Sequence, residues 1–187
     1  MLEFIPETHT YILNGIITPS VSEIMNPMSN TYYSGINPII VEKAAIRGSC
    51  VHSCIEDYEK TGKYEIKDIW KGYLTQYKIA KKVEDWEVLE LEQKMTNGEY
   101  AGTFDCMANY KGKKIFIDYK TSSKLNYTLV QVQFAFYMML AEHNKKEIEE
   151  CWCLHLSKTG YKFEKIEPRY DIAKALLKLY NYLKESE

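Results

Sequence analysis

The spacing of apolar residues predicts a helical first part of the chain. Over residues 39–61, apolar positions recur at the three- and four-residue intervals of an amphipathic helix, which Gly48 weakens in the middle. A second helical stretch follows over about 65–82, with apolar residues on one face and lysines opposite. That face carries Ile69, Tyr73, Tyr77 and Ala80. The first 40 residues hold most of the prolines and predict short elements and loops, including a short helix that Ser20 would cap with Glu23 three residues later.

The pattern then changes to the two-residue period of strands. Residues 88–95, 100–110 and 114–120 alternate in this way or combine β-branched and aromatic residues. Asn97-Gly98 and the turn 111–113 fit tight hairpin connections. These three segments are therefore expected to form an antiparallel meander.

The last third of the chain predicts a helix, a hairpin and a closing helix. A largely apolar helix follows Asn126, and strands 151–157 and 161–166 flank the turn Thr159-Gly160. The closing helix, 170–184, has an apolar stripe. That stripe consists of Ile172, Leu176, Leu179 and Leu183. The element order αβββαβ(β)α predicts an α/β (α+β) fold, in which helices flank a mixed β-sheet.

Length and composition predict one domain. A chain of 187 residues suits a single domain, 1–187, with a mainly helical part over 1–85 and a core over 86–187 that ends in the closing helix. There is no long apolar run and no signal-peptide pattern, so a cytoplasmic location is expected, with the five cysteines as reduced thiols. The net charge of −2 does not by itself indicate a nucleic-acid binder. Clustered carboxylates can, however, offset basic residues that contact phosphate elsewhere.

Two carboxylates and a lysine are candidates for chemistry. Asp118 and Lys120 are two apart on a strand and so share one face, while Asp105 comes from the neighbouring antiparallel strand. Carboxylate oxygens suit Mg²⁺ or Mn²⁺, which can activate water for phosphodiester hydrolysis, and the lysine can orient that water and offset negative charge. Taken alone, the tripeptide Asp118-Tyr119-Lys120 is far more often a surface salt bridge on a strand.

The motifs around these residues resemble a nuclease family. The segments 102–105, 117–121 and 133–137, together with 47–52 upstream, resemble the PD-(D/E)xK nucleases of the RecB-like exonuclease branch in the right order. The segment 18–21 also resembles phage and prophage members, more loosely. The resemblance implies a restriction-endonuclease-like core.

The same resemblance implies a role for each matching residue. Asp105, Asp118, the backbone carbonyl of Tyr119 and His52 would bind one or two Mg²⁺ or Mn²⁺ ions. Lys120 would be the catalytic lysine. Gln133 and Tyr137, four apart on one helical face, would help to position Lys120 or the DNA backbone. Without the motifs, His52, Gln133 and Tyr137 would each be read as ordinary structural residues. Thr121 is the usual companion of the lysine, and Glu56 and Glu92 are candidates for the surroundings of the site only.

The implied function is that of a metal-dependent DNA exonuclease that leaves 5′-phosphates. Recombination, repair and phage DNA processing are the expected contexts, with DNA as substrate and a single-strand annealing or recombination protein as a partner. A structure- or sequence-specific endonuclease and a non-cleaving DNA-binding relative are the alternatives. The sequence leaves open the polarity of digestion, the preferred strand type, DNA against RNA, and the oligomeric state.

Two departures from the family pattern stand out. Phe104 occupies the position of the proline in the motif's name. Some relatives bind an iron–sulfur cluster, but here Cys151 and Cys153 lack the downstream CxxC spacing, so a cluster with Cys50 and Cys54 is not expected.

Phosphate and base contacts are harder to assign. Candidate phosphate contacts are Lys78, Lys81, Lys82, Lys111, Lys113, Lys114 and Lys124. Most of these lysines are equally read as a solvated face, and Tyr32, Tyr33 and Tyr127 could stack on unpaired bases.

Overall fold

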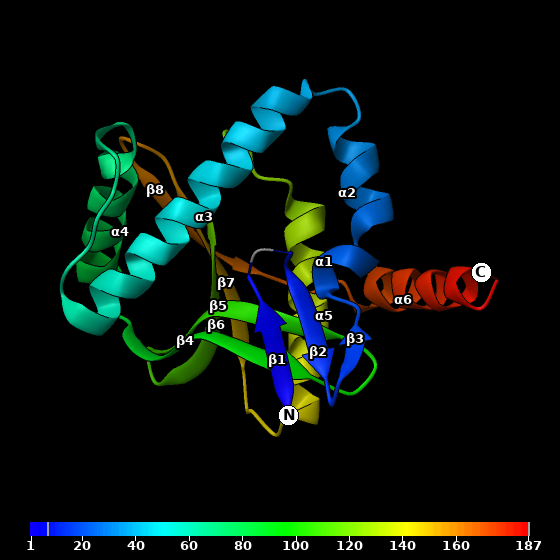
Figure 1. Ribbon diagram of the computed structural model, residues 1–187. Coiled ribbons are helices and arrows are strands. Elements are labelled where there is room, and N and C mark those ends of the chain that lie inside the picture. Colours follow the sequence, from blue (N-terminus) through cyan, green and yellow to red (C-terminus); the bar gives the residue numbers. More distant parts are fainter. Residues whose placement is uncertain (7, 187) are drawn as a thin grey trace.

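A five-stranded sheet is the centre of the protein (Figure 1). The computed structural model describes residues 1–6 and 8–186. The sheet has the order β4-β5-β6-β7-β8. Its strands are β4 (Glu87–Thr96), β5 (Ala101–Tyr110), β6 (Lys113–Lys120), β7 (Glu150–Leu156) and β8 (Tyr161–Ile166).

Strand directions make this a mixed sheet. The pairs β4–β5 and β5–β6 are antiparallel and form the predicted meander. The chain then crosses over through helix α5 (Tyr127–His143), so that β7 lies parallel to β6, and β8 returns antiparallel. The predicted mixed sheet with flanking helices is confirmed.

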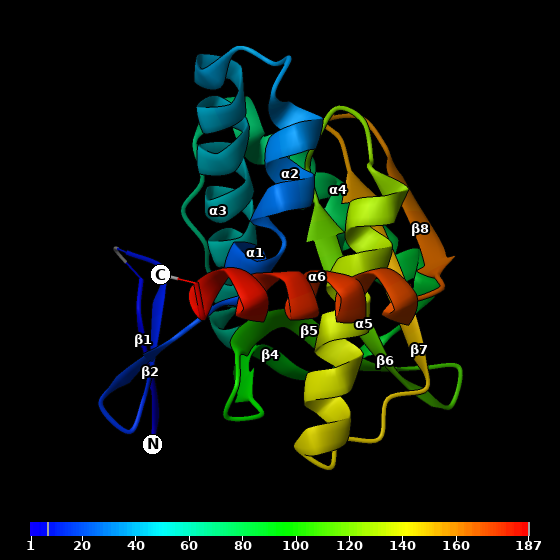
Figure 2. The same cartoon turned by 90° about the vertical axis from the view of Figure 1, so that its right-hand side faces the viewer.

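Helices cover both faces of the sheet (Figures 1 and 2). Helix α3 (Pro38–Thr61), which continues through Gly48, and α4 (Lys71–Glu84) pack on one face and share a core with it. Helix α5 packs on the other face, and α6 (Tyr170–Lys184) packs against α5. Among the described residues, no helix is long and apolar enough to cross a membrane.

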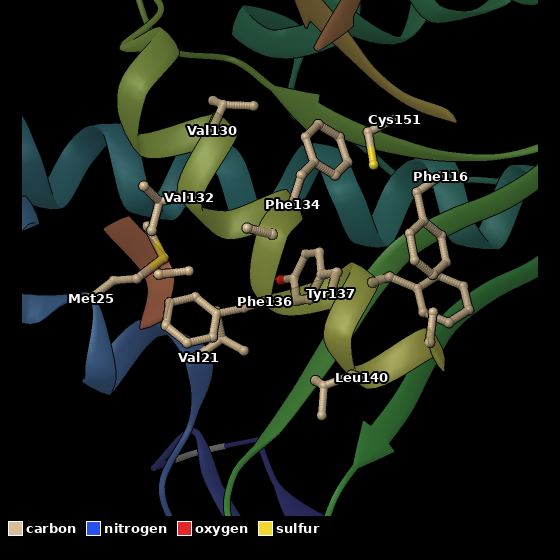
Figure 3. Close-up of a cluster of buried hydrophobic side chains, with 14 of the residues drawn as sticks. Val21, Met25, Phe116, Val130, Val132, Phe134, Phe136, Tyr137, Leu140 and Cys151 are labelled. Carbon is tan, nitrogen blue, oxygen red and sulfur yellow. The ribbon is translucent and has the colours of Figure 1, made fainter. Parts of the chain in front are cut away.

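The core beneath α5 is rich in aromatic rings (Figure 3). The strand pattern puts Phe116 on this face of β6, whereas Ile115 and Ile117 pack on the α3 and α4 face. Phe134 and Phe136 on α5 are fully buried here. Because both faces of β6 are covered, only the ends of its ladder can present polar groups to solvent.

The first residues of the chain form a small sheet of their own. Strands β1 (Leu2–Ile5), β2 (Thr10–Leu13) and β3 (Ile16–Thr18) pair antiparallel in that order. The sequence predicts short elements here, but not that they form a sheet. The short helix α1 (Val21–Ile24) follows as predicted, with the Ser20 side chain accepting a hydrogen bond from the Glu23 N–H, and α2 (Asn26–Tyr33) leads to α3.

Two details of the helix predictions are wrong. The second helix starts later than expected, after the 3₁₀ turn η1 (Asp68–Trp70), so Ile69 lies off the packed face and is 61% exposed. On α6, Leu176 is buried, but Leu179 and Leu183 are exposed, because the C-terminal half of α6 packs through Leu177 and Tyr180 instead.

Candidate active site

The backbone ladder between β5 and β6 stops at the predicted aspartates. Its last pair before this point is Cys106 with Ile117, so the register would next bring Asp105 opposite Asp118. Instead, the Asp105 carboxylate takes over as the acceptor: its Oδ2 accepts a hydrogen bond of 2.7 Å from the Tyr119 N–H. The end of β6 is therefore held by a side chain from β5.

The facing position on β4 is distorted as well. The pairs Leu91–Cys106 and Gln93–Phe104 place Glu92 opposite Asp105, and Glu92 has a positive φ of 49°. Leu91 packs on the α3 face of the sheet, whereas Met95, four residues later, packs on the α5 face. Residues that follow an unbroken two-residue period would stay on one face. The kink at Glu92 is thus a local break of the kind that redirects side chains beside functional sites.

Helix α3 brings His52 to the same place. Ser49, His52, Ser53 and Glu56 follow helical spacing and all line one cleft. His52 Nδ1 lies 3.4 Å from Asp105 Oδ1, and His52 Nε2 lies 2.8 Å from the Tyr119 carbonyl oxygen. A carbonyl oxygen only accepts, so Nε2 is the donor in this contact.

Charge in this part of the site is balanced by protons. Burial alone would lower the pKa of His52, but the charge and hydrogen bond of Asp105 raise it to about 9. Burial opposes ionisation of Asp105, yet the charges of His52 and Lys120 hold its pKa below the usual value. Burial, together with the Asp105 charge, raises the pKa of Glu92 to about 8. These shifts favour a protonated His52 ring between Asp105 and the Tyr119 carbonyl, and they favour the neutral form of Glu92.

On the α5 side, a lysine and its partners form a hydrogen-bonded chain. Lys120 Nζ lies 2.7 Å from Asp118 Oδ2 and donates to Gln133 Oε1 at 2.9 Å. Gln133 Nε2 in turn donates to the Tyr137 hydroxyl at 2.9 Å. Burial raises the pKa of Asp118 to about 6 against the opposing charge of Lys120. Burial would lower the pKa of Lys120, but Asp118 and Asp105 raise it, so the ammonium stays charged.

A glycine allows α5 to approach the sheet closely at this point. A Cβ on Gly102 would lie 3.0 Å from Tyr137 Cε1 and 2.9 Å from Val21 Cγ2. Real Cβ atoms make essentially no contacts that close, so any side chain at this position would push Tyr137 or α1 away. The glycine of the segment 102–105 is thus explained by packing.

The candidate site has two halves. We call His52, Glu92, Asp105 and the Tyr119 carbonyl the α3 half, and Asp118, Lys120, Gln133 and Tyr137 the α5 half. Within the described residues, His52, Glu92 and Asp105 form the group whose ligand atoms all lie within 4.8 Å of one another, and this group could hold a metal ion. Asp118 lies outside that group, with its Oδ2 against Lys120. Oxygen atoms from two carboxylates, a carbonyl oxygen and a ring nitrogen suit a divalent cation.

The structure therefore brings together every predicted site residue and adds one. Glu92, expected only near the site, lies in the potential metal-binding group, while Glu56 lines the cleft and pairs with Lys60. Thr121 is buried at the end of β6, near Arg47. A sequence signal for Glu92 exists only in its position opposite Asp105, which depends on the register.

The α3 half opens into a cleft of about 430 Å³. Helix α3 forms one wall, and Glu92, Thr103 and Asp105 on β4 and β5 contribute from the sheet. Gln133 and Tyr137 reach it from α5, and Phe4, His9 and Tyr11 of the N-terminal sheet also line it. The cleft thus extends from the α3 half to Gln133 and Tyr137 of the α5 half.

Several candidate DNA contacts lie elsewhere. Lys113 pairs with Glu150, and Lys81 pairs with Glu59. The β5–β6 turn with its lysines is at the other end of β6 from Lys120, about 20 Å away at about 3.3 Å per strand residue. Lys124 is exposed just beyond β6.

The sheet separates the upstream and downstream cysteines. Cys54 is buried in the core beneath α3 and α4, whereas Cys151 and Cys153 are buried in the core beneath α5. Each of the five cysteines is a free thiol.

Comparisons with known proteins support the fold. No protein-family model and no curated protein sequence matches the chain. A structure described as a "Putative exonuclease" from Eubacterium rectale is similar, with a TM-score of 0.51, 15% identity, and coverage of 73% of this chain and 64% of that one. SSO0001 gives a TM-score of 0.48 at 18% identity, covering 91% of this chain and 76% of that one. A phage related exonuclease from Haemophilus somnus 129PT gives 0.44 at 10% identity, covering 90% of this chain and 96% of that one. The chain spans a little less than two thirds of the Eubacterium rectale protein and has an exonuclease-like fold, with a group of acidic and histidine side chains that could bind a metal.

Proposed function

We propose that this chain is a metal-dependent DNA nuclease whose active site is the α3 half and the α5 half together. The observation that carries the proposal is the junction at Asp105. This carboxylate contacts His52, a potential metal ligand, and also fixes the backbone of Tyr119, between Asp118 and Lys120. Asp105 therefore links a potential metal-binding group to the strand end that carries a carboxylate–lysine pair.

His52, Glu92 and Asp105 would hold the cation, and the Tyr119 carbonyl and Asp118 would be further ligands. When bound, Mg²⁺ or Mn²⁺ would polarise a phosphate and lower the pKa of a water molecule. The present contacts fit such a group, because Asp105 Oδ1 and the Tyr119 carbonyl both face the imidazolium of His52. That ring now supplies the positive charge that a cation would supply.

Lys120 would act on the phosphate and on the attacking water. Its ammonium is fixed from two sides, by Asp118 and by the amide of Gln133, and the Gln133 amide is oriented by Tyr137. A preorganised charge costs little to reorganise as negative charge builds up on the phosphate. Asp118 therefore has two uses, as a potential ligand and as the partner that keeps Lys120 charged.

We infer DNA as the substrate and exonucleolytic cleavage that leaves 5′-phosphates, in recombination, repair or phage DNA processing. A single-strand annealing or recombination protein would be a natural partner. The fold similarity and the motif resemblance support this choice, whereas the alternatives are an endonuclease on the same core and a non-cleaving relative. The buried Asp118–Lys120 pair argues against a mere binder, because burying a charged pair is costly unless it is used.

The test is digestion of end-labelled linear single- and double-stranded DNA, and of closed circular DNA, with Mg²⁺ or Mn²⁺. We expect metal-dependent release of nucleotides from linear DNA that is lost in Asp118→Ala, and an intact circle. Cutting of the circle would favour the endonuclease. Equal digestion by the wild type and Asp118→Ala would mean that a contaminating nuclease was measured.

A further inference from the structure

One wall of the cleft comes from the N-terminal sheet and is aromatic. Phe4 and Tyr11 lie side by side with ring centroids 4.7 Å apart, and the His9 ring lies edge-on to both, at 5.2 Å from Phe4 and 5.9 Å from Tyr11. All three line the cleft that also contains His52, Glu92 and Asp105. Nothing in the proposed chemistry needs aromatic rings at this position.

The pairing of the small sheet explains why the rings face the cleft. Phe4 pairs with Tyr11, and Tyr11 pairs with Thr18, so these three residues share one face. The opposite face carries Ile12 and Ile17, and Ile17 is 71% exposed. The sheet thus turns its aromatic residues toward the candidate site and leaves aliphatic side chains in solvent.

The three rings differ in how accessible they are. Tyr11 is buried, and its hydroxyl lies 2.7 Å from Thr103 Oγ1 on β5, so it fastens the small sheet to the central one. Phe4 is half-buried and His9 is exposed. Lys94 Nζ lies 5.7 Å from the centroid of the Phe4 ring, which places a cation beside the aromatic surface.

The size of the cleft limits what can occupy it. A volume of about 430 Å³ is in the range of small-molecule pockets, roughly 300–1,000 Å³. Such a cleft holds a nucleotide rather than a duplex. An unpaired nucleotide offers a flat base for rings and a phosphate for the metal-binding group, and both features line this cleft.

We propose that Phe4 and His9 form a stacking subsite for the unpaired base next to the scissile phosphate. This proposal rests on the proposed nuclease function and adds a specificity determinant to it. Ser49 and Ser53 on α3 also line the cleft and provide neutral hydroxyl donors for the sugar and phosphate. Stacking between bases and aromatic side chains tolerates any sequence, since every base has a π face.

The test compares a single-stranded thymidine oligonucleotide with a strand of equal length that carries abasic residues. The variants are Phe4→Leu, which keeps an apolar side chain but removes the ring, and His9→Ala at the exposed ring. Ile17→Ala on the outer face of the same sheet is the matched control. Two quantities are measured with Mn²⁺: kcat/KM, and binding by fluorescence anisotropy in a Lys120→Met background that suppresses turnover.

We expect the preference for the thymidine strand over the abasic strand to fall about tenfold in Phe4→Leu and by less in His9→Ala, with no change in Ile17→Ala. An unchanged preference in both ring variants overturns the subsite, and so does an equal loss on both strands, because the rings would then only support the fold. If the wild type hydrolyses neither strand, the nuclease function fails. The anisotropy ratio still decides the subsite in that case, and equal binding of both strands overturns it.

Discussion

The two halves of the candidate site balance their charges in different ways. In the α5 half, Asp118 and Lys120 neutralise each other, and Gln133 and Tyr137 complete the hydrogen bonds. In the α3 half, oxygen atoms outnumber cationic side chains, and protons on His52 and Glu92 make up the difference. In the α5 half a lysine supplies the positive charge, whereas the α3 half holds protons that a cation could replace.

This difference assigns separate tasks to the halves. The hydrogen bonds from Lys120 to Gln133 and from Gln133 to Tyr137 form without a metal. They can therefore keep their geometry when substrate binds, which suits the positioning of a catalytic lysine. The α3 half suits metal binding, because His52 and Glu92 can give up their protons and then act as ligands, and metal ligands are deprotonated. Substitutions in the α3 half should therefore change metal affinity, and substitutions of Lys120, Gln133 and Tyr137 should change turnover, whereas Asp118, as a potential ligand and the partner of Lys120, should affect both.

The largest effect is expected at the junction. Asp105→Asn keeps the size of the side chain but removes the charge that pairs with His52, and kcat/KM should fall by about 10³-fold or more together with Mn²⁺ binding. Isothermal titration with Mn²⁺ and digestion of linear DNA measure both. Asp171→Asn, at an exposed ion pair with Arg169, is the control and should match the wild type. Normal Mn²⁺ binding in Asp105→Asn would contradict the role of Asp105 as a metal ligand.

Lys120→Met separates the halves. The lysine lies in the α5 half, so Mn²⁺ affinity should change little while kcat falls about 10²- to 10³-fold, the size seen when one preorganised charge-stabilising group is removed. Lys146→Met is a matched control, because Lys146 also pairs with a carboxylate, Glu90, and is similarly buried. Loss of Mn²⁺ binding in Lys120→Met would show that the two halves are not separable.

Glu92→Gln tests the residue that the structure adds to the site. If Glu92 is a ligand, Mn²⁺ affinity should fall about 10- to 100-fold, with a smaller effect on kcat at saturating metal. Glu90→Gln, two residues earlier on β4, should leave Mn²⁺ affinity unchanged. Equal Mn²⁺ affinities in the wild type and Glu92→Gln would show that Glu92 lies near the site but is not a metal ligand.

The protons of the α3 half predict how metal binding depends on pH. In the metal-free protein, the pKa values of His52, about 9, and Glu92, about 8, are raised above their ordinary values, so both groups hold protons at pH 7. Because cation binding has to displace these protons, Mn²⁺ affinity should rise from pH 7 to pH 9, by about tenfold per pH unit for each proton released. Titrations in two buffers with different heats of ionisation count the protons. The Glu92→Gln variant should release one proton fewer when it binds Mn²⁺. An Mn²⁺ affinity that stays constant from pH 7 to pH 9 would contradict protonation of His52 and Glu92 in the metal-free protein.

The regular parts of the molecule could be predicted from the sequence. The period of two along 114–120 correctly placed Asp118 and Lys120 on one face, and the helical spacing of Gln133 and Tyr137 correctly placed both toward the sheet. These are consequences of repeating backbone geometry. The antiparallel meander followed in the same way from the turn residues between its strands.

What could not be predicted depends on breaks in that geometry. Glu92 reaches the site through a left-handed backbone conformation that interrupts the strand period, and no local pattern indicates it. The strands β1 to β3 have only three or four residues, too few for a clear two-residue period, although Asn14-Gly15, both with positive φ, forms a tight turn between β2 and β3. The lysines of 111–114 were candidates for phosphate contacts. They lie at the start of β6, however, at the end of the strand away from Lys120 and the candidate site.

The smallest effect is expected at the end of the α5 chain, in Tyr137→Phe. The Tyr137 hydroxyl accepts the Gln133 amide, so its removal lets the amide rotate and loosens Lys120 without touching the α3 half. A neutral hydrogen bond contributes about 0.5–1.5 kcal/mol, which corresponds to roughly a two- to tenfold loss in kcat with unchanged Mn²⁺ affinity. Tyr100→Phe is the matched control, since Tyr100 is buried in the same core and its hydroxyl has no hydrogen-bond partner among the described residues. A fall in kcat in Tyr137→Phe but not in Tyr100→Phe would show that the position of Lys120 depends on the whole chain of hydrogen bonds. Equal kcat values in Tyr137→Phe and the wild type would limit the functional part of the α5 half to Asp118, Lys120 and Gln133.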